Sequence, residues 1–253
     1  MAKGNGKWIK ELRSLATKRH REKAGLFVAE GPKVVADLLA AGWTLETVYA
    51  TESGRGHLPQ RFAGQADTVS EETLARISFL QHPQGVVALF HLPEAKTPQP
   101  SAKELYIALD GVQDPGNVGT IIRIADWFGI NRIYCSPDTA DAYAPKVVQA
   151  SMGSIARVEI VYTDLHLLLQ SLPADMPVFG TFLDGDNIYD GQLPESGIVV
   201  MGNEGNGISP GLRALISKKL LIPNFRPDGQ RAESLNVAVA TAIVCSEFRR
   251  KSE

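Results

Sequence analysis

The chain contains few of the residues that mark a metalloprotein, a disulfide-stabilised protein or a thiol enzyme. Cys135 and Cys245 are its only cysteines, and neither belongs to a CxxC pair. Both lie in apolar segments, which predicts two buried thiols in a reducing compartment. The five histidines are scattered without HxxxH or HExxH spacing. A protein-bound metal is therefore not expected.

Long apolar runs are also missing. No stretch approaches the roughly 18 apolar residues that a membrane-spanning helix needs, and the N-terminus lacks the apolar core of a signal peptide. Together with the two thiols, this predicts a cytoplasmic protein with no membrane partner. The length of 253 residues and the ordinary globular composition favour one or two domains.

A strong net charge is absent too, since the chain carries only −2 at pH 7. The charge is nevertheless unevenly spread, because residues 1–26 contain eight Lys and Arg against two Glu. Residues 7–23 are predicted to form one helix with its bases on one side. These bases either form a solvated face or contact phosphates, and Lys18, Arg19 and Arg21 are the candidates for phosphate contacts with RNA.

A proline-rich stretch divides the chain. Residues 93–103 read PEAKTPQPSAK, which is linker composition. Residues 1–92 are predicted to be a small α/β domain, with strands at 26–30, 45–50 and 85–92 and helices at 32–41 and 70–77. Residues 104–253 alternate strands with helices, which predicts an α/β domain with a mainly parallel sheet covered on both faces.

The last helix, predicted over 235–248, is apolar on nearly every side. Leu235 and Val239 lie on one face, and Val237 and Val244 lie on the opposite face. A helix that is apolar on both faces must be covered on both. The sheet can cover one face, and the simplest cover for the other is the same helix of a second copy, so the chain is expected to form a homodimer.

Ligands of parallel sheets bind where loops leave the carboxyl ends of the strands. The loop DGVQDPGNVGTIIR, residues 110–123, has the GxxxxG spacing of a phosphate loop, but Asn117 and Val118 stand where Lys and Ser/Thr are required. GxGxxG is missing as well, so nucleotide-binding sites of both kinds are disfavoured. Asn117 is expected to cap the next helix. Arg123, on an otherwise apolar helix, needs an anion or carbonyl partner, unless it forms a structural ion pair.

Two further loops carry polar side chains. The segment VVMGNEGNGIS, residues 199–209, holds three glycines within six residues, which lets its backbone approach a ligand closely. Glu204 at its tip is either solvated or directed at a ligand. The third loop ends in Ser234, Leu235 and Asn236, at a helix start whose N–H groups can face a ligand. Alone, Ser234 could simply cap that helix.

In this order, the segments NVGTIIR, VVMGNEGNGIS and LLIPNFRPDGQRAESLNVAVATAIVCSEF resemble the three motifs of the SpoU/TrmH branch of the SPOUT RNA methyltransferases. The resemblance covers roughly residues 105–250, and residues 1–92 more loosely resemble the substrate-binding domain that precedes it in several members. It implies an α/β fold whose C-terminal segment forms a deep trefoil knot, an exception to the rule that chains avoid knots. It also implies S-adenosylmethionine (AdoMet) as cofactor, a homodimer with the active site at the subunit interface, and 2′-O-methylation of a ribose in rRNA or tRNA.

The resemblance implies roles for individual residues. The catalytic positions are Asn117, Arg123, Glu204, Ser234 and Asn236. The positions that line the cofactor are Thr181, Gly202, Asn203, Gly205, Ile222, Pro223 and Leu235. The sequence departs from the family in the loop between Pro223 and Ser234, which is longer than usual.

Two alternatives follow from the residues themselves. The family's convention makes Arg123 the general base, but a guanidinium keeps its proton up to a pKa above about 12. Its other role is to grip a phosphate and the developing oxyanion. The second alternative concerns the whole chain, which could be an RNA-binding assembly factor without catalysis. The intact catalytic positions disfavour this reading.

Overall fold

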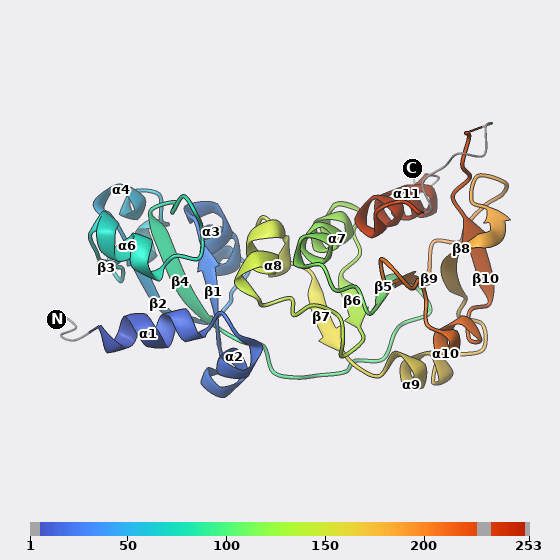
Figure 1. Ribbon diagram of the computed structural model, residues 1–253, viewed down its shortest axis with the longest axis horizontal. Coiled ribbons are helices and arrows are strands. Elements are labelled where there is room, and N and C mark those ends of the chain that lie inside the picture. Colours follow the sequence, from blue (N-terminus) through green and yellow to red (C-terminus); the bar gives the residue numbers. More distant parts are fainter. Residues whose placement is uncertain (1–5, 227–233, 251–253) are drawn as a thin grey trace. The chain divides into compact units, whose positions relative to one another are not determined.

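The computed structural model of the protein describes residues 6–226 and 234–250 (Figure 1). Its contacts separate two compact units. The first contains the chain up to residue 94 together with 141–157, and the second contains 95–140 and the chain from 158 onward. The chain therefore passes between the units three times. The division expected from the sequence, 1–92, 93–103 and 104–253, contains no such return of 141–157 to the first unit.

The first unit is built on a four-stranded sheet in the order β1-β4-β2-β3. The strands are β1 (Leu26–Glu30), β2 (Leu45–Ala50), β3 (Asp67–Thr68) and β4 (Val86–His91). β4 pairs antiparallel with β1 and β2, while β3 pairs parallel with β2. The three strands predicted from the sequence are confirmed, and the two-residue β3 was not predicted.

Helices complete this unit. They are α1 (Lys7–Ser14), α2 (Lys18–Ala24), α3 (Pro32–Ala40), α4 (Glu52–Arg55), α5 (Gln60–Ala63), α6 (Glu71–Ile77), α8 (Pro145–Ala150) and the 3₁₀ helix η1 (Ser154–Ala156). α8 packs on β1 and η1 packs on α3. Segment 141–157 is therefore part of the packing of the first unit, although it lies 47 or more residues beyond the rest of that unit in sequence.

The single helix predicted over 7–23 is wrong, because the structure has two helices there. α1 ends at Ser14, and the backbone of Thr17 before α2 is extended, with φ −101° and ψ 142°. The Arg21 guanidinium donates to the carbonyl oxygens of Leu15 at 2.6 Å and Ala16 at 2.9 Å. These carbonyls at the end of α1 are thus satisfied by a side chain instead of by continued helix.

The second unit contains a six-stranded sheet in the order β10-β8-β9-β5-β6-β7, and all its pairings are parallel. The strands are β5 (Leu105–Asp110), β6 (Arg132–Cys135), β7 (Glu159–Tyr162), β8 (Val178–Asn187), β9 (Gly197–Gly202) and β10 (Lys218–Leu221). This confirms the predicted parallel α/β fold. β8 meets β10 in two registers, because residues 181–185 stand opposite no residue of β10.

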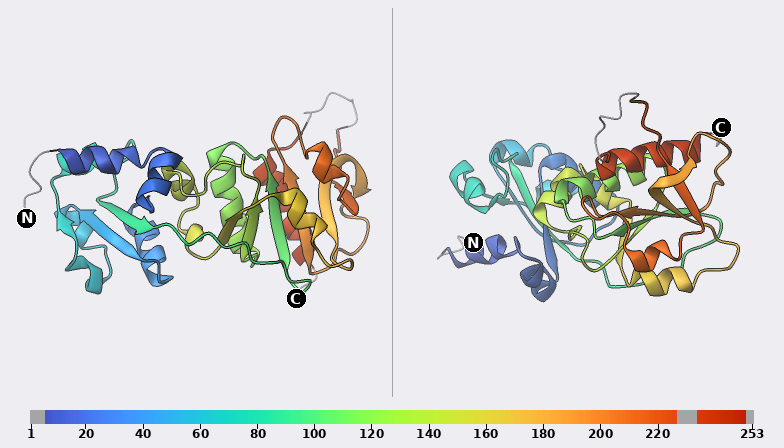
Figure 2. Two further views of the ribbon diagram at one scale, coloured as in Figure 1. Left: turned by 90° about the horizontal axis from the view of Figure 1, so that it is seen from below. Right: turned by 45° about the vertical axis from the view of Figure 1, so that its right-hand side comes forward.

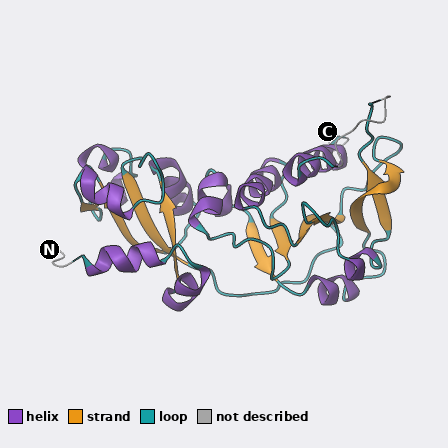
Figure 3. Ribbon diagram, viewed as in Figure 1, coloured by secondary structure: helices purple, strands orange, loops and turns teal. Residues whose placement is uncertain are grey.

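Helices cover both faces of the parallel sheet (Figures 2 and 3). On one face lie α7 (Pro115–Trp127) and α11 (Val237–Arg249), which pack against each other. The ring of Phe248 in α11 meets that of Phe179 in β8 edge to face, 4.9 Å apart. On the other face, α9 (Leu165–Gln170) and α10 (Pro210–Arg213) bury Leu168 and Leu212 against the sheet. The sheet is therefore the middle of three layers.

The two faces of α11 differ in exposure. Val237, Val244 and Phe248 on its inner face are buried, whereas Val239 on its outer face is 50% exposed, and Leu235, two residues before the helix, is 49% exposed. The inner face agrees with the predicted packing on the protein's own sheet. Within residues 6–226 and 234–250, no element covers the outer face at Val239.

Candidate functional site

Three loops of the second unit meet at the carboxyl edge of the parallel sheet. Asp110 ends β5 and Gly202 ends β9, and these two residues are paired neighbours in the sheet. The loop after β5 leads into α7, and the loop after β9 runs from Asn203 to Ser209. The Asp110 carboxylate accepts a hydrogen bond from the Ser209 amide at 2.7 Å, so the two loops are fastened to each other. The third loop, 234–236, begins α11.

A chain of side-chain hydrogen bonds joins one predicted residue from each loop. The Asn236 amide donates to Asn117 Oδ1 at 2.9 Å, and Asn117 Nδ2 donates to Glu204 Oε1 at 3.0 Å. The three residues are 119 and 87 positions apart in sequence. Helix packing of α11 on α7 brings Asn236 and Asn117 together, because both helices begin at the same edge of the sheet. The structure thus assembles three of the five predicted catalytic residues.

Glu204 is held by backbone groups as well. The amides of Gln113 and Asp114 each donate to its carboxylate at 3.3 Å. Burial raises the pKa of Glu204, but the hydrogen bonds from the Asn117 side chain, from its own amide and from Gln113 and Asp114 outweigh this. The net result is a pKa below the ordinary value, so Glu204 is a carboxylate and an acceptor near neutral pH.

The glycine-rich loop around Glu204 is held by the side chain of Asn203. Asn203 Nδ2 donates to Gly111 O at 2.7 Å, while its Oδ1 accepts from the amides of Gly205 and Asn206. A side chain at Gly202 would place its Cβ 2.3 Å from the backbone of Gly207. Only glycine permits this approach of the loop to the strand end.

The helix caps differ from the expectation. Asp114, not Asn117, caps α7, since its Oδ1 accepts the Asn117 amide at 2.9 Å. Asn117 lies within the first turn, and its side chain is therefore available for Glu204 and Asn236. Asn236 caps α11, because its Oδ1 accepts from Ala238 and Val239. Ser234, the alternative cap, is exposed two residues earlier.

Arg123 stands apart from this chain of hydrogen bonds. It is exposed on α7, and its guanidinium makes no hydrogen bond or ion pair with the residues that the structure describes. The structural ion pair considered as the simpler alternative is thus not found within residues 6–226 and 234–250. Unpaired among the described residues, the guanidinium can bind an anion from outside the chain.

The predicted cofactor residues are distributed along the same edge. Thr181 follows the last β8 residue that pairs with β9, and Ile222 and Pro223 directly follow β10. Thr181, Ile222 and Pro223 are partly exposed, and Leu235 lies beside Asn236. With Gly202, Asn203 and Gly205 they offer one hydroxyl, an amide, backbone groups and apolar side chains. No charged side chain belongs to this set.

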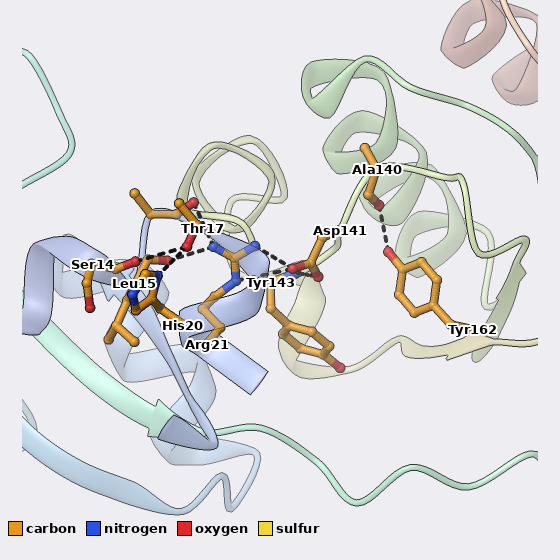
Figure 4. A network of polar contacts seen from close by, with 10 residues as sticks. Ser14, Leu15, Thr17, His20, Arg21, Ala140, Asp141, Tyr143 and Tyr162 are labelled. Carbon is orange, nitrogen blue, oxygen red and sulfur yellow. Dashed lines mark hydrogen bonds and ion pairs between the residues drawn. The ribbon is translucent and has the colours of Figure 1, made fainter. Parts of the chain in front are cut away.

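The predicted phosphate contacts lie in the first unit, on α2. Lys18 and Arg19 are exposed, but Arg21 is 2% exposed and its guanidinium is bonded to Asp141 and to backbone carbonyls (Figure 4). Arg21 therefore cannot reach an RNA phosphate without breaking these bonds. The prediction is corrected at this residue and kept for Lys18 and Arg19.

Sequence reasoning missed three supporting residues. Asp110 and Asp114 fix the loops, and Ser136 accepts the Gly111 amide at 2.9 Å. The signal for Asp114 was present, because Asp followed by Pro115 is a typical N-cap with proline at the first helical position. Asp110 and Ser136 act through backbone amides far away in sequence, which no local pattern reveals.

The described residues offer little support for a metal site, a membrane span or a thiol nucleophile. No group of three or more His, Cys, Asp or Glu that could hold a metal ion occurs there, and none of the described helices is long and apolar enough to cross a membrane. Both cysteines are free and buried. Burial raises the pKa of Cys135, and it raises that of Cys245 to about 12, so neither thiol is a ready nucleophile.

Family models and related proteins match this chain over both of its units. Residues 104–246 match the model of the SpoU rRNA Methylase family, and residues 7–88 match the MRM3-like substrate binding domain. The 23S rRNA (guanosine(2553)-2′-O)-methyltransferase RlmP of Bacillus subtilis is 32% identical over 244 residues, 95% of each chain.

Two solved structures are similar over nearly the whole length. The AdoMet-bound rRNA methyltransferase of Sinorhizobium meliloti has 30% identity and a TM-score of 0.86, and the match covers 99% of this chain and 97% of that one. A Porphyromonas gingivalis protein assigned to the TrmH family of RNA methyltransferases has 41% identity and a TM-score of 0.86, with 99% and 100% covered. With its three motif loops joined at one edge of a parallel sheet, this chain belongs to the SpoU rRNA methylase family.

Proposed function

We propose that this protein is an AdoMet-dependent methyltransferase that methylates the 2′-hydroxyl of a ribose in RNA, and that its substrate is rRNA. The observation that carries the proposal is the hydrogen-bonded chain Asn236–Asn117–Glu204, which unites all three motif loops. The Bacillus subtilis relative is named for 2′-O-methylation of 23S rRNA, and a Sinorhizobium meliloti relative has been solved with AdoMet.

The residues at the carboxyl edge fit AdoMet. An adenosine needs apolar contacts and neutral hydrogen-bond partners, and Thr181, Ile222 and Leu235 together with the backbone of 202–205 supply these. When bound, AdoMet supplies a methyl group on a positively charged sulfur. The carboxylate of Glu204 lies in the same set of loops and carries a negative charge near neutral pH.

The chain's own residues act chiefly by position. Asn117 is fixed from both sides, by Asn236 and by Glu204, which holds its amide in one orientation. An oriented amide can bind the ribose or its phosphate, and alignment of the reacting groups can supply about 7–11 kcal/mol of the barrier. The guanidinium of Arg123 pairs with none of the residues in 6–226 and 234–250, and it suits a phosphate or the developing alkoxide better than proton abstraction.

We further propose that α11 forms the homodimer interface. About half of the Val239 side chain is exposed on α11, whose inner face is buried, and Leu235, two residues before the helix, is exposed to the same extent. A second copy of α11 would cover them. The deep trefoil knot is part of the same proposal, supported by family membership.

The RNA-binding role of the first unit is also a proposal. Its support is the match of residues 7–88 to a substrate binding domain and the exposure of Lys18 and Arg19 on α2. A cytoplasmic location is proposed with it, supported by the two buried free thiols and by relatives that modify ribosomal RNA.

The deciding experiment maps 2′-O-methyl groups in total RNA from cells with and without the gene, and repeats the reaction with purified protein, AdoMet and unmodified rRNA. We expect one ribose to lose its methyl group in the deletion strain and to regain it in vitro. If AdoMet binds in equilibrium dialysis but no RNA is methylated, the substrate is wrong. If AdoMet does not bind, the protein is an RNA-binding factor and the proposed activity is refuted.

A further inference from the structure

Arg21 is a charged side chain sealed inside the first unit (Figure 4). Its Nε donates to Asp141 Oδ2 at 3.1 Å, its Nη2 donates to the same oxygen, and its Nη1 donates to Leu15 O and Ala16 O. The side chains of Arg21 and Asp141 are 3% and 15% exposed. A buried guanidinium must be satisfied in this way, so its position is closely defined.

Asp141 is the residue at which the chain returns to the first unit. Its Oδ1 accepts the Tyr143 amide at 3.0 Å, which fixes the carboxylate from the other side. The preceding residue, Ala140, belongs to the second unit. There its amide donates to Val112 O at 2.9 Å and its carbonyl accepts the Tyr162 hydroxyl at 2.6 Å.

The loop that ends at Ala140 supports the loop of the proposed active site. Ser136 Oγ accepts the Gly111 amide at 2.9 Å, and Ala140 is bonded to Val112. Gly111 and Val112 immediately precede Gln113 and Asp114, whose amides hold Glu204. A continuous series of hydrogen bonds and one peptide bond thus leads from Arg21 to the active-site loop.

The same Arg21 belongs to α2, whose exposed face carries Lys18 and Arg19. A buried ion pair stabilises a fold little compared with apolar contacts, but it does fix one geometry. On the basis of the proposed function, we propose that Arg21 is a positioning residue. Through Asp141 it links the RNA-binding helix α2 to the order of loop 111–114, so that RNA held on α2 favours the ordered active-site loop.

A hydrogen-exchange experiment tests the link without relying on activity. In the full-length chain, Arg21→Met should make the Gly111 and Ala140 amides exchange at least tenfold faster, although neither residue touches Arg21. The matched control is Val35→Ala, which opens a space in fully buried α3 packing and leaves Arg21 and Asp141 intact. If the control accelerates these amides equally, the effect is general destabilisation of the first unit and the proposal is refuted.

A kinetic cycle tests the consequence for RNA. Arg21→Met, Asp141→Asn and the double variant are compared at a temperature well below their Tm. We expect each single variant to lower kcat substantially and to change the KM for RNA much less. The double variant should have a kcat no lower than that of the poorer single variant, and the salt dependence of RNA binding should stay unchanged. A salt slope lowered by Arg21→Met alone would mean direct phosphate contact, and additive losses would mean independent roles. Either result would overturn the proposal, whereas failure of every variant and the wild type to methylate RNA would count against the proposed function alone.

Discussion

At the scale of single residues, Asn117 is the centre of the site because its side chain bonds to both other motif loops. Asn117→Ala removes the bonds to Asn236 and Glu204. We expect kcat to fall by about 100-fold, the effect of losing one preorganised donor, while AdoMet affinity measured by calorimetry stays the same. The control is Thr120→Ala on the exposed side of the same helix, where the hydroxyl only bonds to Gly116 O. Equal losses in both variants would show a general effect on α7.

The lowered pKa of Glu204 should set the pH below which the hydrogen bonds to its carboxylate are lost. Because its pKa in the folded protein lies below the ordinary value of 4.5, the carboxylate and its hydrogen bonds persist as the pH falls past the point where a solvated glutamate becomes protonated. They are lost only when the pH falls through the lowered pKa. We expect the Gln113 and Asp114 amides to stay protected from hydrogen exchange at pH 4.5 and to lose protection below it. Glu204→Gln should remove this pH step, and a step above pH 4.5 would contradict the assigned direction.

The catalytic role of Arg123, as anion binder or as proton acceptor, can be assigned by its substitution with lysine. A lysine keeps the charge but cannot grip a phosphate with two parallel N–H groups. If Arg123 holds an anion, Arg123→Lys should lose about 100-fold in kcat/KM at every pH between 7 and 10. If Arg123 is the proton acceptor, activity should instead rise with pH as the lysine loses its proton near its ordinary pKa of about 10.4. Single-turnover rates across this pH range distinguish the two roles.

At the scale of elements, the open face of α11 predicts the behaviour of the assembly. Val239→Asp places a charge at a half-exposed apolar position, so it should convert the dimer into a monomer in sedimentation equilibrium and abolish methylation. Leu167→Asp is the matched control, because Leu167 is 63% exposed on α9 at the opposite face of the sheet. A monomeric wild type, or dissociation by the control variant, would contradict the proposed interface.

The elements also show what sequence patterns can and cannot predict. The helices α3 and α6, and the alternation of strands and helices in residues 104–253, follow from hydrophobic period and capping residues, which are local properties. The break between α1 and α2 was missed because Arg21 finds its partner, Asp141, 120 residues later. The same limit applies to the caps. Asn117 has the chemistry of a cap, but the preceding Asp114 takes that place and leaves the Asn117 side chain for the site.

At the scale of the whole molecule, the proposed catalytic residues lie in the second unit and the proposed RNA contacts lie in the first. The three motif loops were expected at one sheet edge because all parallel strands end there, and the structure places Asn117, Glu204 and Asn236 together. The basic N-terminal face was expected as one group. Burial separates it, since Arg21 lies inside the first unit while Lys18 and Arg19 remain exposed. A sequence shows which residues are charged, but packing determines which of these side chains is buried.

Reversing the exposed charges of α2 tests the remaining part of that surface. If Lys18 and Arg19 each contact one RNA phosphate, Lys18→Glu with Arg19→Glu should weaken RNA binding and reduce the slope of log K against log salt by about 1.4–1.8, the release of counterions from two phosphates. AdoMet affinity should not change, because the cofactor residues lie in the second unit. Lys96→Glu with Lys103→Glu alters the net charge equally in the segment before β5 and serves as the control. Fluorescence anisotropy with the RNA target over a salt series gives both slopes, and equal slopes for wild type and the α2 variant would show that this face of the helix is only solvated surface.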